Sequence, residues 1–445
     1  MTSIAADGRR RYAIVGAGAR AEMFVRAITG EHADRARLVA LADVNATRMR
    51  AHNRWLAAAG QPPVPAYAAA DVAAMLAREQ VDELVVTSVD RTHAGYVVTA
   101  LEAGCDVLTE KPMTVDVAGC QAILDAVERT GRRVSVAFNY RYNPVHEAVR
   151  AVLASGEIGE IGSVHFEWLL DVRHGADYFR RWHRDKANSG GLLVHKAGHH
   201  FDLVNWWLAA APVEVYAQGR LFFYGEAGAR HGYARDYDRA HGSPAASGDP
   251  FALSLAGNER LRELYLDAEA DDGYRRDLNV FAPGASIEDD MAVLVRYDTG
   301  ATMSYHLTAY APWEGYRFMV NGSRGRLELE VVENDHVAPD GAAELKDAAI
   351  HGVVGASESG RRSLTVRPFW SPPREVALPA EDRTGHGGAD ARMTGVLIGG
   401  RTDPMARSAT ARDGALALLT GLAANRSMET GAPVRVDDLL ELKQK

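Results

Sequence analysis

The chain has 445 residues, of which 47% are hydrophobic and 24% charged, and its formal net charge is −9 at pH 7. This length predicts two domains, and the composition is that of a folded protein. The acidic balance disfavours nucleic acid or an anionic membrane as a partner, because both attract an excess of Lys and Arg. We find no signal-peptide h-region and no apolar run long enough for a membrane span, so we expect a cytoplasmic protein.

The first 140 residues alternate short strand-like runs with helical segments. Helical spacing occurs at 21–29, 45–58 and 115–130, and the aliphatic, strand-like runs lie at 12–15, 38–43, 83–87, 106–109 and 133–138. Such runs are typical of strands buried on both faces, and their alternation with helices predicts a doubly wound parallel sheet. We therefore expect a Rossmann domain over residues 1–140.

The sequence pattern changes after residue 140. Helices are expected at 144–155 and 190–208, and strands at 163–170, 292–297, 301–308 and 317–323. Glycines between the later strands favour antiparallel hairpins. Residues 141–445 are thus expected to form an α+β domain with an open, largely antiparallel sheet. A polar insertion at about 219–290, with helical spacing at 258–270, is either a lid or oligomer arm or a surface excursion.

A GxGxxA sequence at residues 16–21 follows the first strand directly. Gly16 permits a tight turn, Gly18 lets the backbone approach a pyrophosphate, and Ala21 allows close packing of helix on strand. The next helix points its N-terminal N–H groups toward such phosphates. A tight turn without a ligand is the alternative, but the strand, the helix and a following acid together favour a dinucleotide site.

That acid is Asp43, which closes the next strand. A carboxylate there can accept hydrogen bonds from the adenosine ribose and would repel a 2′-phosphate, so it favours NAD over NADP. Arg48, one turn into the following helix, could partly reverse this preference, or it is a solvated helix residue.

Two further polar stretches follow strands, Thr87-Ser-Val-Asp-Arg-Thr-His93 and Thr109-Glu110-Lys111-Pro112. Ligands of open α/β sheets bind at the edge where parallel strands end. By itself the Glu-Lys-Pro sequence is more typical of an exposed loop.

These motifs, with the later Gly190-Gly191 segment and its His199 and Asp202, resemble the glucose–fructose oxidoreductase/inositol dehydrogenase/rhizopine-catabolism (Gfo/Idh/MocA) family. The resemblance extends from Arg11 to about Leu440. It implies redox chemistry on sugars, cyclitols and their derivatives, and an open sheet that often mediates oligomers, hence a homodimer or homotetramer. The candidate cofactor contacts are Gly16, Gly18, Arg20, Ala21, Asp43, Thr87, His93, Glu110 and Lys111.

The candidate catalytic residues are Lys111, His199 and His195. His195, His199 and Asp202 are spaced i, i+4 and i+7 and would share one helix face. The resemblance implies that Lys111 binds the reacting hydroxyl and that His199 is the catalytic histidine, whereas His195 stands where most members carry aspartate. We assign Lys111 as stabiliser of the developing alkoxide, His199 as general base, and His195 as orienter or proton relay. A structural role is the alternative for each histidine.

The same spacing also fits a helical zinc site made of His195, His199 and Asp202. Lys196 lies beside them, and an ammonium group opposes a dication, so no metal is expected. Candidate substrate contacts are Arg141 and Tyr142 at the domain junction, Asp202, and His183 and His386 in polar loops; turns or ion pairs explain them equally well.

The sequence therefore predicts an NAD(P)-dependent oxidoreductase that transfers a hydride between nicotinamide and a hydroxyl carbon of a sugar, sugar derivative or cyclitol. One alternative is an NAD-dependent glycosidase that acts by transient oxidation and elimination with a recycled cofactor. Another is a non-catalytic NAD-binding regulator, which the retention of Lys111 and His199 disfavours.

Overall fold

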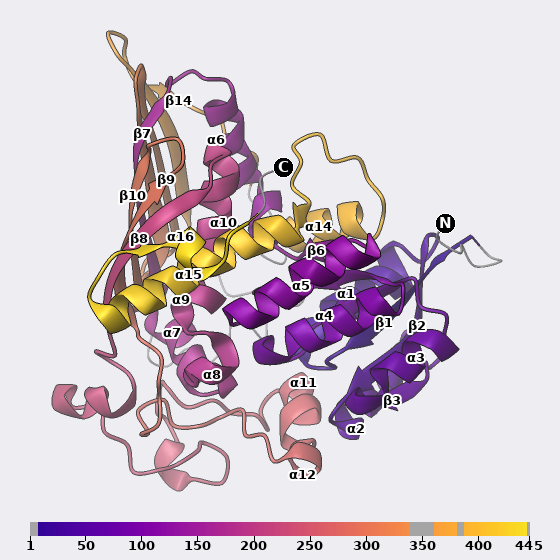
Figure 1. The fold of residues 1–445 in the computed structure, drawn as a ribbon. Helices are drawn as coiled ribbons and strands as arrows, with labels where there is room; N and C mark the ends of the chain where they lie inside the picture. Colours follow the sequence, from indigo (N-terminus) through magenta and orange to yellow (C-terminus); the bar gives the residue numbers. More distant parts are fainter. Residues whose placement is uncertain (1–7, 338–359, 381–386, 443–445) are drawn as a thin grey trace.

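The computed structural model describes residues 8–337, 360–380 and 387–442. Within these residues the chain forms a seven-stranded and a nine-stranded sheet, each packed against helices (Figure 1). No helix of the described part combines the length and the apolar character that crossing a membrane requires.

The seven-stranded sheet has the order β15-β6-β5-β4-β1-β2-β3. Its strands are β1 (Arg10–Val15), β2 (Ala36–Asp43), β3 (Ala66–Ala68), β4 (Glu83–Val86), β5 (Asp106–Thr109), β6 (Val134–Val136) and β15 (Ala409–Thr410). All neighbours are parallel except β15, which pairs antiparallel with β6. Every residue of β4 and β5 is buried, as expected for central strands covered on both faces. The predicted Rossmann sheet is confirmed, with β3 and β15 added to the five predicted strands.

The helices of this part are α1 (Ala19–Arg26), α2 (Ala46–Ala58), α3 (Val72–Arg78), α4 (His93–Glu102) and α5 (Val117–Thr130). Side chains fix where they begin: Asn45 accepts a hydrogen bond from the N–H of Arg48 at the start of α2, and Asp116 accepts one from Gly119 at the start of α5. Gly131 ends α5 in the left-handed conformation, with a φ of 64°. The predicted helix at 21–29 continues after α1 as a π-helical turn, Ala27–Glu31.

The nine-stranded sheet has the order β14-β13-β12-β11-β7-β10-β9-β8-β16. Its strands are β7 (Ile161–Asp171), β8 (Pro212–Arg220), β9 (Asp290–Tyr297), β10 (Thr302–Ala311), β11 (Glu314–Gly322), β12 (Gly325–Asn334), β13 (Arg361–Pro368), β14 (Arg374–Glu375) and β16 (Val434–Arg435). Among the described strands of this sheet, β7 and β10 are the one parallel pair, and the other pairs are antiparallel. Buried and exposed residues alternate along β9, so one face packs on helices and the other is open (Figure 1). The predicted open sheet is confirmed.

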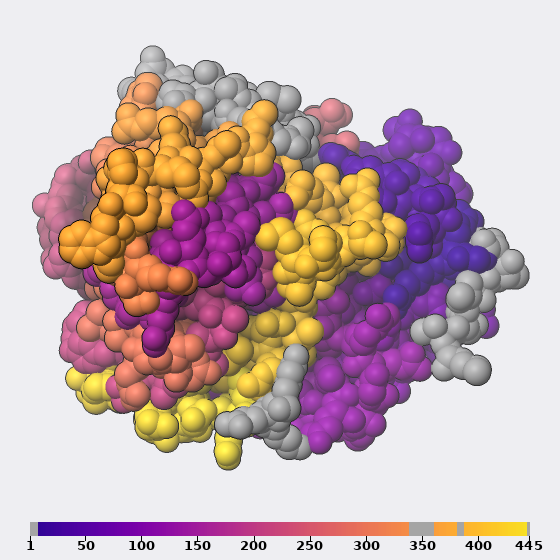
Figure 2. All heavy atoms as spheres, turned by 90° about the horizontal axis from the view of Figure 1, so that it is seen from above, coloured from indigo at the N-terminus to yellow at the C-terminus, as the bar shows by residue number. Residues whose placement is uncertain are grey.

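The helices after β6 are α6 (Pro144–Ala154), α7 (Val172–Phe179), α8 (Lys186–Ser189), α9 (Leu192–His195), α10 (Ala197–Leu208), α14 (Ala389–Leu397), α15 (Ala411–Thr430) and α16 (Val436–Leu439). Of these, α14 packs into the core of the first sheet. Helix α15 approaches α9 closely, because a Cβ at Gly421 would lie 2.5 Å from the carbonyl oxygen of Leu193. Seen from above, the C-terminal segment drawn in yellow lies between the two domains (Figure 2). Together with β15, it ties the end of the chain back to the first sheet.

The prediction of one continuous helix over 190–208 is wrong, because the structure has two helices there. Helix α9 ends at His195, and α10 begins at Ala197 after Lys196. The predicted common face is therefore divided between two helices. His195 meets residues of the first domain, whereas Asp202 lies inside α10, where it pairs with Arg141.

The insertion between β8 and β9 contains only short helical segments. They are η6 (Gly225–His231), η7 (Pro244–Ala246), α11 (Glu259–Leu261), η8 (Arg262–Leu266) and α12 (Glu269–Asp272). The helical spacing predicted at 258–270 is thus confirmed in position, although it is divided among α11, η8 and α12. These last segments lie beside α2 of the Rossmann part (Figure 1).

Candidate active site

The turn after β1 has the geometry of a phosphate-binding loop. Gly16 has a φ of 96°, and a Cβ there would lie 2.4 Å from the amide nitrogen of Ser88, so only glycine fits. Gly18 precedes α1 directly, and a Cβ there would meet only the hydroxyl of Tyr265, at 3.9 Å. Ala21 is fully buried in α1. The backbone at Gly18 therefore leaves room beside the N-terminus of α1, where the hydroxyl of Tyr265 is the nearest side-chain atom.

Asp43 lies at the end of β2, beside this loop. Its carboxylate accepts hydrogen bonds from the N–H groups of Ala17, at 2.5 Å, and Asn45, at 2.8 Å. Burial raises the pKa of Asp43, while the guanidinium of Arg48, 3.7 Å away, acts in the opposite direction. The carboxylate is therefore fixed at the place predicted for contact with a ribose.

Four predicted cofactor contacts hold the surrounding loops together. Arg20 pairs with Glu110, and its guanidinium lies 3.3 Å from Asp390. The hydroxyl of Thr87 donates to the carbonyl oxygen of Gly16 at 2.6 Å. The ring nitrogens of His93 lie 2.8 Å from the carbonyl oxygen of Pro112 and 3.0 Å from that of Ser88. These residues fix the glycine loop and the Glu110–Pro112 loop relative to one another.

One cavity of about 680 Å³ extends from the glycine loop to the second domain. It contacts Gly16, Gly18 and Asp43 in the first domain, and Lys111, His195 and His199 also line it. The residues predicted for the nucleotide and those predicted for the chemistry thus open into a single space. Ala21 is the one predicted cofactor residue outside its lining; it packs the helix instead.

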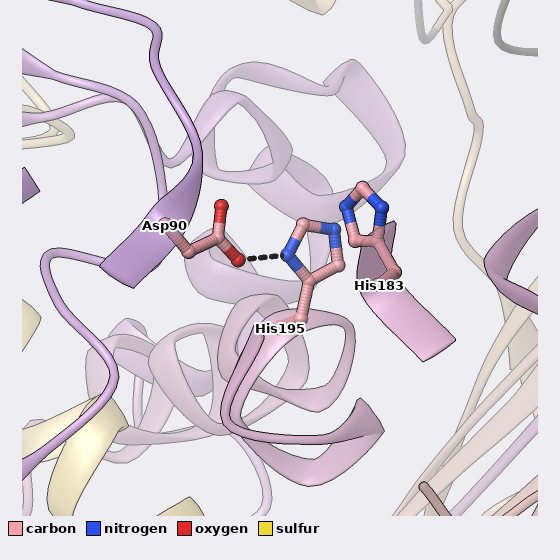
Figure 3. A group of neighbouring side chains, drawn as sticks. All are labelled: Asp90, His183 and His195. Carbon is pink, nitrogen blue, oxygen red and sulfur yellow. Dashed lines mark hydrogen bonds and ion pairs between the residues drawn. The ribbon is translucent and has the colours of Figure 1, made fainter. Parts of the chain in front are cut away.

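Lys111 and His195 meet at the domain junction. The Nζ of Lys111 lies 3.3 Å from Nε2 of His195 and 3.4 Å from its carbonyl oxygen. On the other side of the same ring, Nδ1 of His195 lies 2.5 Å from a carboxylate oxygen of Asp90 (Figure 3). His183 completes the group, with its ring centroid 4.2 Å from that of His195. A lysine, two imidazoles and a carboxylate therefore converge on one side of the cavity.

His199 lines the cavity from α10. Its ring stacks on that of Tyr140, with centroids 4.3 Å apart and an interplanar angle of 14°. Tyr140 in turn accepts a hydrogen bond from Nζ of Lys196 at 3.0 Å. Lys196 also lies 5.2 Å from the ring centroid of Trp168, a cation–π distance. The plane of the His199 ring is thus set by an aromatic stack.

Three of the predicted substrate contacts lie outside the cavity lining: Arg141, Tyr142 and Asp202. Arg141 forms a bidentate ion pair with Asp202, at 2.6 and 2.8 Å, and both side chains are almost completely buried. This is the ion-pair alternative considered for Arg141, and it connects the domain junction to α10. Burial raises the pKa of Asp202 to about 6, whereas Arg141 acts to lower it. His386 lies outside the described residues.

The pairing of Asp202 with Arg141 takes one ligand away from the helical zinc site that the sequence spacing would allow. Its three ligands do not come together: His195 bonds Asp90, His199 stacks on Tyr140, and Asp202 faces Arg141. A different group among the described residues, Asp90, His183 and His195, brings three ligand atoms within 4.8 Å of one another.

The cavity lining includes residues that were not predicted from the sequence, among them Asp90, Tyr265 and Asp272. Asp90 lies inside the polar stretch between Thr87 and His93, so its position past a strand end was the available signal. Tyr265 and Asp272 belong to the insertion. Nothing in their local sequence indicates that they reach the Rossmann domain.

The insertion makes a row of contacts along the nucleotide end of the cavity. The N–H of Ala19 donates to the hydroxyl of Tyr265 at 3.2 Å, and Nδ2 of Asn45 donates to the carbonyl oxygen of Ala268 at 2.8 Å. Arg48 donates to the carbonyl oxygen of Leu264 at 3.0 Å and pairs with Asp272 at 2.9 Å. The insertion therefore forms a wall of the site, as the lid interpretation requires and a free surface excursion would not.

A Rossmann sheet with a glycine loop and a Lys–His cluster across one cavity define a two-domain, dinucleotide-binding oxidoreductase. Residues 10–138 match the oxidoreductase family with an NAD-binding Rossmann fold, and residues 150–436 match its C-terminal α/β domain. The chain belongs to this Gfo/Idh/MocA family, as the sequence motifs predicted.

Curated relatives are similar over most of the chain. The Bacillus subtilis protein named "Putative oxidoreductase YteT" is 32% identical over 375 residues, which is 81% of this chain and 83% of YteT. Inositol 2-dehydrogenase of Gluconacetobacter diazotrophicus is 36% identical over 360 residues, 78% of this chain and 94% of that enzyme.

Solved structures share the fold at lower identity. Aldose–aldose oxidoreductase from Caulobacter crescentus has a TM-score of 0.61 at 16% identity, covering 96% of this chain and 99% of that one. The WlbA dehydrogenase from Bordetella pertussis, solved with NADH and UDP-GlcNAcA, has a TM-score of 0.62 at 19% identity, covering 98% and 100%.

Proposed function

We propose that this enzyme is an NAD-dependent dehydrogenase that oxidises a hydroxyl carbon of a sugar, sugar derivative or cyclitol, or reduces the corresponding carbonyl. The observation that carries the proposal is the single cavity that joins the glycine loop to Lys111, His195 and His199. Two relatives named inositol 2-dehydrogenase, at 30% and 36% identity, make cyclitols the first substrates to test.

The roles follow from chemistry and position. The nicotinamide, when bound, supplies the hydride acceptor. Lys111 holds the reacting hydroxyl and stabilises the developing negative charge on its oxygen, because a positioned ammonium group is a strong hydrogen-bond donor to an oxyanion. His199 takes the hydroxyl proton, and its ring is already oriented by Tyr140. His195 orients Lys111 or relays its proton.

Two features support NAD rather than NADP. Asp43 occupies the position at the end of β2 where a carboxylate would repel a 2′-phosphate. Arg48, the residue that could have reversed this preference, is bound by Asp272 and by the carbonyl oxygen of Leu264. Its guanidinium is therefore committed to the insertion, and Asp272 adds a second negative charge to this end of the cavity.

The test is a substrate screen on the purified protein, read by the absorbance of NADH. We expect stoichiometric NADH with at least one free cyclitol, sugar or sugar acid, and a preference for NAD over NADP. Turnover of an aryl glycoside without net NADH would instead support the recycled-cofactor glycosidase. Failure of any such compound to react, in a protein that binds the dinucleotide, would contradict both.

We also propose that the chain assembles as a homodimer or homotetramer through the open face of the nine-stranded sheet. Leu294, on β9, is 56% exposed there, and an apolar side chain on an open sheet is a candidate contact. Light scattering coupled to size exclusion tests this: Leu294→Asp should dissociate the assembly, and a monomeric wild-type protein would contradict the proposal.

A further inference from the structure

The family resemblance leaves one departure unexplained: His195 occupies a position where most members carry aspartate. In the structure a carboxylate is nevertheless present, one step further from Lys111. Asp90, in the loop after β4, lies 2.5 Å from Nδ1 of His195, and Nε2 of the same ring lies 3.3 Å from Nζ of Lys111 (Figure 3). The three groups form a row, carboxylate, imidazole and amine, that crosses the domain junction.

We propose that Asp90 is a positioning residue that acts through His195 on Lys111, so that the row works as a proton relay during turnover. This inference rests on the proposed function, since it concerns the protonation of the group that holds the reacting hydroxyl. It selects the relay role for His195 and assigns to Asp90, on the Rossmann domain, the carboxylate that position 195 lacks.

The tautomer of His195 follows from its two neighbours. A carboxylate accepts hydrogen bonds, so the ring places its proton on Nδ1 toward Asp90. Nε2 then carries a lone pair directed at Lys111 and can accept an N–H from it. Both Asp90 and His195 are largely buried, 3% and 7% exposed, so water does not compete for these bonds.

The proton balance of the relay is simple. When Lys111 passes a proton to His195, an N–H bond at Nζ breaks and one at Nε2 forms. The positive charge moves from the ammonium to an imidazolium next to the Asp90 carboxylate. The neutral amine of Lys111 is then a second acceptor for the hydroxyl proton, beside its direct transfer to His199. The reverse steps return a proton to an alkoxide.

The surroundings keep this exchange local. Burial raises the pKa of Asp90, and the charge of Lys111 acts in the opposite direction. His183 packs edge-on against His195. Because burial lowers the pKa of His183, its ring stays neutral beside the row. Glu110 and Arg181 are further charged groups that act on Asp90, and Arg276 acts on the neighbouring His183.

A metal ion bound by Asp90, His183 and His195 is the competing explanation, because their ligand atoms lie within 4.8 Å of one another. Two ligand atoms on one tetrahedral zinc ion lie about 3.3 Å apart. The contact of 2.5 Å between Asp90 and Nδ1 of His195 is a hydrogen bond and too short for that arrangement. If His195 used Nε2 instead, the ion would lie next to the ammonium of Lys111. The geometry favours a shared proton.

The first test reads the tautomer directly and needs no substrate. In protein labelled with ¹⁵N-histidine, we expect His195 to show a protonated Nδ1 and an unprotonated Nε2, assigned by loss of its signals in His195→Gln. Asp90→Asn keeps an acceptor oxygen but removes the charge, so it should weaken this preference. His306→Gln, which alters the exposed His306–Asp290 pair on the open sheet, should leave it unchanged. An Nε2-protonated ring in the wild type would overturn the proposal.

The second test uses turnover with the best substrate of the screen. Without the carboxylate the imidazolium loses its stabilisation, so Asp90→Asn should lower kcat about a hundredfold and shift the acid limb of its pH profile to lower pH by about one unit. KM should change little, because the proposal places Asp90 behind His195 rather than against the substrate. A normal profile in a folded, dinucleotide-binding Asp90→Asn protein would refute the relay.

The metal content of the purified protein distinguishes a proton relay from a metal site. One equivalent of metal in the wild type, lost in both Asp90→Asn and His183→Gln, would show a ligand group and overturn the relay. If Asp90→Asn does not fold, the tautomer of His195 in the wild-type protein still tests the proposal. If no compound in the screen is oxidised, the proposed function fails, but the ¹⁵N measurement judges the Asp90–His195 arrangement independently.

Discussion

The guanidinium of Arg48, on the first turns of α2, lies 2.9 Å from the carboxylate of Asp272, on the last short helix of the insertion. The second domain thereby reaches back across the cavity and binds a basic side chain that lies next to Asp43. The ion pair joins residues more than two hundred positions apart in the sequence, and under the proposed NAD preference it keeps Arg48 from a 2′-phosphate.

Asp272→Asn should therefore weaken the preference for NAD. With its ion pair lost, Arg48 can turn toward the ribose, and one negative charge leaves the site. We expect the ratio of kcat/KM with NADP to that with NAD to rise about tenfold, the size of one modest electrostatic contact. The matched control is Asp271→Asn, whose carboxylate accepts the N–H of Thr47 rather than Arg48. An equal effect of both substitutions would point to the docking of the insertion instead.

This arrangement also shows where sequence reasoning reached its limit. The glycine loop, Asp43 and the Glu110–Lys111–Pro112 loop were predictable because each lies next to the strand that positions it. Parallel strands end at one edge of the sheet, so local order was enough. The break at Lys196 was not predictable, because residues 190–208 keep helical spacing across it.

The partners of the predicted residues were also beyond the reach of the sequence. The sequence allowed two roles for Arg141, a substrate contact or an ion pair. The ion pair with Asp202 depends on how α10 packs at the domain junction. Asp90, Tyr265 and Asp272 act through contacts between distant segments, which no spacing rule encodes. Which side chains pair across the two domains follows from their tertiary packing.

Lys111→Ala should lower kcat a hundredfold or more, the scale expected when one donor to a developing oxyanion is removed. Dinucleotide binding, followed by fluorescence, should persist because the glycine loop and Asp43 are untouched. Lys186→Ala is the matched control: it removes a lysine that pairs with Glu288 at 2.5 Å, on the second domain. Turnover at the wild-type rate in Lys111→Ala would remove this residue from the mechanism.

His199 and His200 are neighbours in α10 with different surroundings, and this permits a paired experiment. His199 lines the cavity, whereas His200 is fully buried, with Nδ1 2.7 Å from the hydroxyl of Tyr305. His199→Gln should reduce kcat about a hundredfold with little change in Tm. His200→Gln should lower Tm while the remaining folded protein keeps its kcat. The reverse result would make His199 a structural residue.

His52 predicts a dependence of stability on pH. It is buried in α2, with Nε2 3.1 Å from the carbonyl oxygen of Ala17, and burial lowers its pKa from 6.5 to about 4. Between these two values the unfolded chain binds a proton that the folded protein excludes, so stability falls as pH drops through this window. From about pH 7 to about pH 5, this histidine alone should reduce the free energy of unfolding by about 2 kcal/mol. His52→Gln keeps a donor for Ala17 but does not titrate, so urea unfolding should show a correspondingly smaller loss in this variant. Equal losses in both proteins would mean that His52 is already protonated, or exposed, in the folded state.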